Sequence, residues 1–227
     1  MVVLPQLSKH VFLKKKNKIL LLQNKALELS MFLSLPAAVA LIVGSEQIIS
    51  ALFGYGSFDE LSVSNSANAL FYFGLGLPAF ALIKVFSTFF FANQDTKTPF
   101  YISLFSVILN ILISIYFFRE IGFIIIPIAT TISSWFNAII LFVYLKNKDL
   151  FNFNELFFAK LIKILLSSIL MGIFFNYLIL FFENKLIYEY NFKSFYLILS
   201  AFLSLIFYLS FSLFIKAFKY GDIKLKY

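Results

Sequence analysis

The sequence predicts an all-α, polytopic membrane protein, because long apolar stretches alternate along it with short polar ones. Hydrophobic residues make up 61% of the 227 residues, well above the roughly 45–50% apolar share of soluble domains. The charged residues, 13% of the chain, cluster between apolar runs of about the length that crosses a hydrocarbon core. This pattern excludes a soluble enzyme and indicates a membrane helical bundle.

Taken in order, the chain is expected to fall into three parts. Residues 1–27 resemble the end of a preceding helix followed by a basic segment on the membrane surface. Residues 28–148 contain four apolar runs, and residues 149–227 contain two more and a lysine-rich tail. The six transmembrane helices are expected at about 28–53, 69–92, 99–118, 123–145, 157–182 and 193–218.

Glycine, proline and polar residues mark the turns and kinks. The first span contains Pro36 and Gly44, which membrane helices tolerate where neighbouring groups satisfy the freed backbone. The Gly74-x-Gly76-x-Pro78 motif predicts a kink in the second span. Thr98 is expected to cap the third helix and Pro99 to occupy its first position, where a missing N–H is harmless.

The distribution of basic residues predicts which loops face the cytoplasm. One set of loops contains only Arg119, Lys185 and Lys193, whereas all other basic residues except Lys84 fall in the opposite set. By the positive-inside rule, the segment 9–25, the turn 93–98 and the C-terminus are therefore cytoplasmic.

The net charge of +8 belongs to lysines that flank apolar spans, where the positive-inside bias and anionic membrane lipids account for it. Nucleic acid is therefore not an expected partner. The chain has no cysteine, which excludes disulfides and thiolate metal sites.

Lys84 is the one basic residue deep inside an apolar run, and an ionisable residue at such depth indicates a functional site. It lies about four residues past the midpoint of its span, roughly 6 Å toward the cytoplasm. Helical side chains tilt toward the N-terminus, here away from that nearer surface. We therefore favour a water-filled cavity or a groove that faces an anionic ligand. The alternatives are a lysine that snorkels or one that binds backbone carbonyls.

Polar side chains also line the third and fourth spans. Asn110 and Ser114 are one turn apart, and Thr130 begins a polar stripe on the next span. Their oxygens could hold a hard cation such as sodium, but interhelical hydrogen bonds and small-residue packing are commoner in membrane bundles. Glu46 is expected at the outer interface. The spans contain no carboxylate pair, no His and acidic cluster and no nucleophile beside a base, so the protein is not expected to be an enzyme.

Several motifs together resemble the MurJ (MviN) family of lipid II flippases, within the multidrug/oligosaccharidyl-lipid/polysaccharide exporter superfamily. The resemblance covers about residues 1–148, and the last two spans match only in position and hydropathy. The motifs are Leu4-Pro-Gln-Leu-Ser-Lys9, Leu35-Pro-Ala-Ala-Val-Ala40, Leu52-Phe-Gly-Tyr-Gly-Ser-Phe58, Gly76-Leu-Pro-Ala-Phe80, Lys84-Val85, Phe91-Ala-Asn-Gln-Asp-Thr-Lys-Thr-Pro99 and the segment 129–137.

The family fold consists of two helical lobes around a central cavity, with two further C-terminal helices that line a groove for a polyprenyl tail. The resemblance implies that residues 28–148 are a four-helix part of the C-terminal lobe and that residues 149–227 contain the groove helices. It also implies that the N-terminal lobe, with the cavity arginines that bind pyrophosphate, would be a separate or missing partner.

The resemblance implies roles for individual residues. Lys84 matches the family lysine of the Lys-Val motif and would bind substrate, while Gln94, Asp95, Thr98 and Pro99 match a cytoplasmic signature turn. Some members are described with a sodium site between the helices that correspond to the third and fourth spans. Asn110 and Thr130 fall at its ligand positions, but Ser114 stands where an acidic ligand is expected, which weakens a cation site.

The function that the resemblance implies is transport of lipid II, the undecaprenyl-pyrophosphate-linked peptidoglycan precursor, across a bacterial inner membrane. The mechanism would be alternating access, driven by membrane potential or a sodium ion, with no other cofactor. The alternatives are an exporter of another lipid-linked glycan or of drugs, and an inactive truncated fragment. A drug exporter should have acidic cavity residues, whereas Lys84 favours an anionic substrate.

Overall fold

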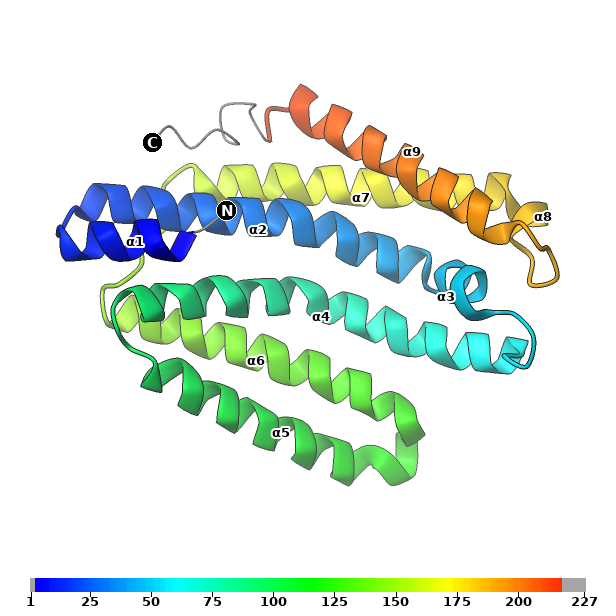
Figure 1. The fold of residues 1–227 in the computed structure, drawn as a ribbon, viewed down its shortest axis with the longest axis horizontal. Helices are drawn as coiled ribbons and strands as arrows, with labels where there is room; N and C mark the ends of the chain where they lie inside the picture. Colours follow the sequence, from blue (N-terminus) through cyan, green and yellow to red (C-terminus); the bar gives the residue numbers. More distant parts are fainter. Residues whose placement is uncertain (1–2, 218–227) are drawn as a thin grey trace. The chain divides into compact units, whose positions relative to one another are not determined.

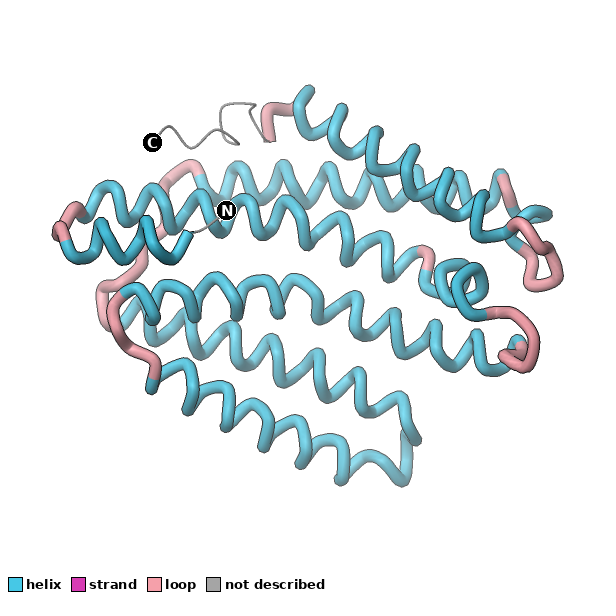
Figure 2. Tube along the Cα trace, viewed as in Figure 1, coloured by secondary structure: helices cyan, strands magenta, loops and turns pink. Residues whose placement is uncertain are grey.

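The computed structural model describes residues 3–217, and every regular element in this range is a helix (Figures 1 and 2). The predicted fold class is thereby confirmed. The elements are α1 (Val3–Phe12), α2 (Lys16–Val43), α3 (Ser45–Phe53), α4 (Glu60–Ala92), α5 (Lys97–Ile121), the 3₁₀ turn η1 (Gly122–Ile124), α6 (Ile125–Asn147), α7 (Phe157–Phe181), α8 (Glu183–Leu186) and α9 (Lys193–Phe214).

Within the described residues, five helical stretches are long and apolar enough to cross a membrane. Four of them are α2, α4, α7 and α9, and the fifth is the 51-residue stretch Lys97–Asn147. This stretch contains both α5 and α6, which turn back on each other at η1 and lie side by side (Figure 1). At 25 and 23 residues, each is long enough to cross by itself.

The first span differs from the prediction at both ends. A single helix was expected over 28–53, but α2 ends at Val43, and Gly44 separates it from α3. Gly44 lies against an aromatic ring, since a Cβ there would come within 2.5 Å of Phe175 Cε1. At the other end, α2 starts at Lys16 and includes part of the basic segment that was expected on the membrane surface.

The other boundaries shift by smaller amounts. The polar residues before the second span belong to α4, which begins at Glu60. Helix α5 begins at Lys97 rather than at Pro99, and α9 ends at Phe214. The predicted end of the last span at residue 218 and the lysine-rich tail lie outside the described residues.

The described chain divides into two compact units that interleave in sequence. The first comprises the described residues up to Ser34 together with Gly76–Leu161, and the second comprises Leu35–Leu75 and the described residues from Ile162 onward. The three-part division along the sequence therefore stays a prediction.

In the first unit, aromatic rings from α4 and α6 pack around Phe151. This residue follows α6, is buried, and stacks on Phe89 of α4 with ring centroids 5.7 Å apart. Phe86 and Phe142 also contact it, at 6.4 and 6.3 Å. These contacts anchor the segment after α6 against the helices of this unit.

Gly76 allows close packing between α4 and α6. A Cβ added at this residue would come within 2.9 Å of Thr131 Oγ1 and 3.5 Å of Thr131 Cα. We expect Gly76→Val to lower the free energy of unfolding by about 1–3 kcal/mol, because the backbones must separate. Thermal unfolding of the purified protein in detergent measures this. Leu61→Val, at an exposed position of the same helix, should change it by less than about 0.5 kcal/mol.

Candidate functional site

The turn between α4 and α5 is organised by the carboxylate of Asp95. Gln94 adopts a left-handed conformation with φ 61°, and the next residue, Asp95, accepts hydrogen bonds from Thr98 N at 3.0 Å and Thr98 Oγ1 at 2.7 Å. Thr98 was expected to cap the helix, but the N-cap residue is Thr96, and Thr98 instead donates to the Asp95 carboxylate. Pro99 is buried at the third helical position rather than the first.

A long-range ion pair ties this turn to the end of α6. Lys148 Nζ lies 2.8 Å from Asp95 Oδ2 and 3.3 Å from Thr98 Oγ1. Burial by itself would raise the pKa of Asp95, but the hydrogen bonds from Lys148 and Thr98 outweigh it and lower the pKa to about 2. The turn is therefore held by an ionised carboxylate at neutral pH.

The low pKa of Asp95 predicts that stability depends on pH. The pKa is about 2 in the folded protein against an ordinary value of 3.8, so the stabilisation is present above about pH 4 and is lost as pH falls toward 2. Allowing for solvent screening of this partly exposed pair, it amounts to about 1 kcal/mol. Unfolding midpoints of the wild type and Asp95→Asn should differ at pH 7 and converge near pH 2. A constant difference would contradict the assignment.

Lys84 is exposed on α4 in the first unit. Its backbone carbonyl accepts a hydrogen bond from Thr88 Oγ1 at 2.8 Å. Within residues 3–217, its ammonium has no hydrogen-bond or ion-pair partner, so no backbone carbonyl binds it. This leaves the ammonium available at the helix surface, as both the cavity interpretation and the snorkelling interpretation require.

A polar seam joins α5 to α6. Asn110 Nδ2 donates to Thr130 Oγ1 at 3.0 Å and to Ser133 Oγ at 3.4 Å. One turn away on α5, Ser114 Oγ is buried without a partner among the described residues. The structure thus brings Asn110 and Thr130 together but does not bond Ser114 to them.

The seam supports the packing interpretation directly, because the amide nitrogen of Asn110 faces Thr130 and forms an interhelical hydrogen bond. In the part of the chain that the structure describes, no group of three or more histidine or acidic residues could hold a metal ion. The sodium site stays a prediction.

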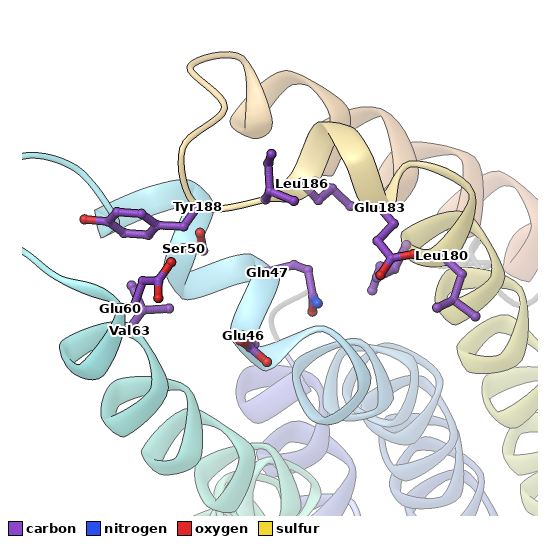
Figure 3. Close-up of a pocket in the computed structure, with 11 residues that line it drawn as sticks. Glu46, Gln47, Ser50, Glu60, Val63, Leu180, Glu183, Leu186 and Tyr188 are labelled. Atoms are coloured by element: carbon purple, nitrogen blue, oxygen red, sulfur yellow. The ribbon is translucent and has the colours of Figure 1, made fainter.

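The second unit contains a pocket of about 430 Å³. Figure 3 shows carboxylates from three different elements around it: Glu46 in the first turn of α3, Glu60 in the first turn of α4 and Glu183 in α8. Glu46, which was expected at the outer interface, lies in the first turn of the short helix α3.

Lys193, which sequence analysis assigned to a loop, is fully buried beside this pocket. Its ammonium donates to Gly54 O at 2.7 Å and to Tyr188 O at 2.6 Å. It also lies 4.4 Å from the ring centroids of both Tyr55 and Tyr188. Because Tyr188 lines the pocket, Lys193 fixes one wall of it. The sequence signal that could have indicated this contact is the presence of Gly54, Tyr55 and Tyr188 in the two polar turns that precede α4 and α9.

These features define a multi-pass helical membrane protein with an unpaired ammonium inside one span and no catalytic arrangement among the described residues. The family described as "Lipid II flippase MurJ" matches residues 1–199, well beyond residues 1–148, over which the sequence resemblance was noted. The chain therefore belongs to the MurJ lipid II flippase family. A flippase is a transporter and not an enzyme, as the sequence predicted.

Two relatives and one solved structure agree with this assignment. A probable lipid II flippase MurJ from Rhizobium meliloti is 40% identical over 63% of this chain, and one from Rickettsia prowazekii is 36% identical over 76%. The chain spans only 27% and 34% of these proteins. A structure titled "Lipid II flippase MurJ, inward closed conformation" matches 95% of this chain and 43% of its own with a TM-score of 0.74. At 24% identity, it supports the fold alone.

Proposed function

We propose that this chain forms the C-terminal part of a lipid II flippase in a bacterial inner membrane. It would move the undecaprenyl-pyrophosphate-linked peptidoglycan precursor to the outer face by alternating access between two lobes. The observation that carries the proposal is the family match over residues 1–199. The cytoplasmic position of the turn at Asp95 and of the C-terminus follows from the lysine distribution and belongs to the same proposal.

Lys84 would contribute positive potential toward the pyrophosphate of the substrate. An ammonium without a protein partner in the described range is available to a phosphate oxygen, and removal from bulk water strengthens such an attraction. A cationic drug would be repelled by the same group. Lys84 therefore favours a lipid-linked anion.

Helices α7 and α9 would shelter the polyprenyl tail. They pack together through stacked rings of Phe174 and Phe207, whose centroids are 4.8 Å apart. Both helices also carry many exposed apolar side chains that an isoprenoid chain could contact. Examples are Ile169, Ile173, Tyr177, Leu180, Ile198, Phe202, Leu205 and Leu209.

Membrane potential or sodium binding would drive the cycle. If sodium binds, the oxygens of Asn110 and Thr130 are the proposed ligands, and Ser114 would supply a neutral oxygen in place of a carboxylate. The interhelical hydrogen bond between Asn110 and Thr130 would then rearrange when the ion binds.

Complementation by a chimera tests the proposal. The chimera joins this chain to the N-terminal part of the Rickettsia prowazekii relative, in place of the segment that it matches. We expect it to support growth of a strain depleted of its own lipid II flippase, while the N-terminal part alone should not. A chimera that reaches normal membrane levels and still gives no growth would contradict the proposal and favour a non-transporting fragment. Rescue of a strain that lacks a different lipid-linked glycan exporter, but not this one, would favour the rival substrate.

A further inference from the structure

A second pocket, of about 520 Å³, lies within the first unit. Its walls come from the turn between α1 and α2, the residue that follows α4, and the segment after α6. Lining residues include Lys14 and Lys16 on the first wall, Asn93 on the second, and Asp149 and Asn152 on the third. Polar and charged groups from separated parts of the sequence thus converge on one space.

The electrostatic surroundings of this pocket are positive. Both lysines that line it are exposed, and Asp149 is the one carboxylate among its described lining residues. With two ammonium groups against one carboxylate, the lining carries a net positive charge. An environment that disfavours an added positive charge favours an anion.

Hydrogen bonds from α2 hold the third wall in place. Gln23 Nε2 donates to Leu150 O at 2.9 Å, and Asn24 Nδ2 donates to Asn152 O at 3.0 Å. Asn24 Oδ1 in turn accepts from Asn154 N at 3.0 Å. Gln23 and Asn24 are 0% and 4% exposed, so these bonds are shielded from water. The pocket is preformed rather than left to a free loop.

The pocket also has an apolar side. The rest of its lining is apolar and consists of Val11, Ile19, Leu20 and Leu150. Phe12, the neighbour of Val11 in the sequence, is 86% exposed. Lysines combined with apolar residues and an exposed aromatic ring are typical of segments that lie at the boundary between lipid headgroups and acyl chains.

We propose that this pocket binds the phosphate of an anionic phospholipid headgroup. Lys14 and Lys16 would pair with the phosphate oxygens, and the apolar side would contact the first part of the acyl chains. Asp149 offsets one of the two lysine charges, so the pocket matches a singly charged phosphodiester, such as phosphatidylglycerol. The site is separate from Lys84, and the inference does not depend on the proposed transport function.

Native mass spectrometry of the purified full chain tests this site. Phosphatidylglycerol and phosphatidylcholine with identical acyl chains are offered in equal amounts, and the retained lipid is measured. The wild type should retain phosphatidylglycerol preferentially, and the double variant Lys14→Gln/Lys16→Gln should retain about tenfold less of it. The matched control, Lys15→Gln/Lys18→Gln, removes the same charge from the same segment but not from the pocket, and it should retain nearly the wild-type amount.

A variant that is expected to bind more lipid separates loss of the site from misfolding, because a misfolded protein would only lose binding. Asp149→Asn removes the repelling carboxylate and should increase phosphatidylglycerol retention. Equal losses in both double variants would overturn the site in favour of a diffuse surface potential. A wild type that shows no preference for phosphatidylglycerol would overturn binding of an anionic headgroup altogether. Displacement of phosphatidylglycerol by an equimolar polyprenyl pyrophosphate, but not by inorganic pyrophosphate, would instead assign the pocket to a pyrophosphate lipid.

Discussion

Replacement of Lys193 by methionine should lower the free energy of unfolding by about 2–4 kcal/mol, because one buried and one partly buried carbonyl group lose their donor. The ammonium of the fully buried Lys193 donates to Gly54 O and Tyr188 O. Methionine has a similar length but cannot donate a hydrogen bond. The cation–π contacts to Tyr55 and Tyr188 are lost as well.

Unfolding of the purified protein in mixed micelles measures this loss. Lys185→Met is the matched control, since Lys185 is exposed near the same turn and lies 4.8 Å from the ring centroid of Tyr190. That variant should lie within about 0.5 kcal/mol of the wild type. Equal stabilities of the two variants would show that the buried ammonium does not hold these loops together.

Lys84→Ala should reduce transport by the chimera about tenfold or more, because one charge-assisted contact to a phosphate is worth about 1.5–3 kcal/mol. Lys84→Arg keeps the positive charge and should retain part of the activity. Growth of the depleted strain at matched membrane levels is the readout. Lys97→Ala, which removes an exposed lysine from the first turn of α5 outside the apolar core of that helix, should grow like the wild type.

A snorkelling Lys84 makes a different prediction. If the ammonium only reaches toward the headgroups, its replacement by alanine should leave growth unchanged, and arginine should behave like lysine. Full growth of Lys84→Ala would therefore remove this residue from the substrate path.

Apolar run length was enough to predict the long helices, with α5 and α6 as separate spans, but not their ends. The length of an apolar run reports the part of a helix that crosses hydrocarbon. It does not report the first turns of α2, where Lys16 and Lys18 continue the helix, because lysine is a good helix former. Gly44, which separates α2 from α3, lies against Phe175, and a contact with a residue so far away in the sequence has no local signal.

Sequence analysis singled out Asp95 and Thr98 in the turn between α4 and α5 but did not predict the contacts that they make. Asp95, Thr96 and Thr98 are all common capping residues, and sequence alone does not choose between them. The pairing of Asp95 with Lys148 joins residues 53 positions apart, beyond any local pattern. Lys193 was counted as a loop charge, because a count of charges by loop contains no information about burial.

We propose that this chain supplies the C-terminal part of a lipid II flippase. The most direct test measures the fraction of labelled lipid II that is accessible at the outer face of the membrane, in flippase-depleted cells that express the chimera. We predict that accessible lipid II returns to the undepleted level with the wild-type chimera and stays low with Lys84→Ala. Lipid II that remains on the inner face, despite normal membrane levels of the wild-type chimera, would contradict the account.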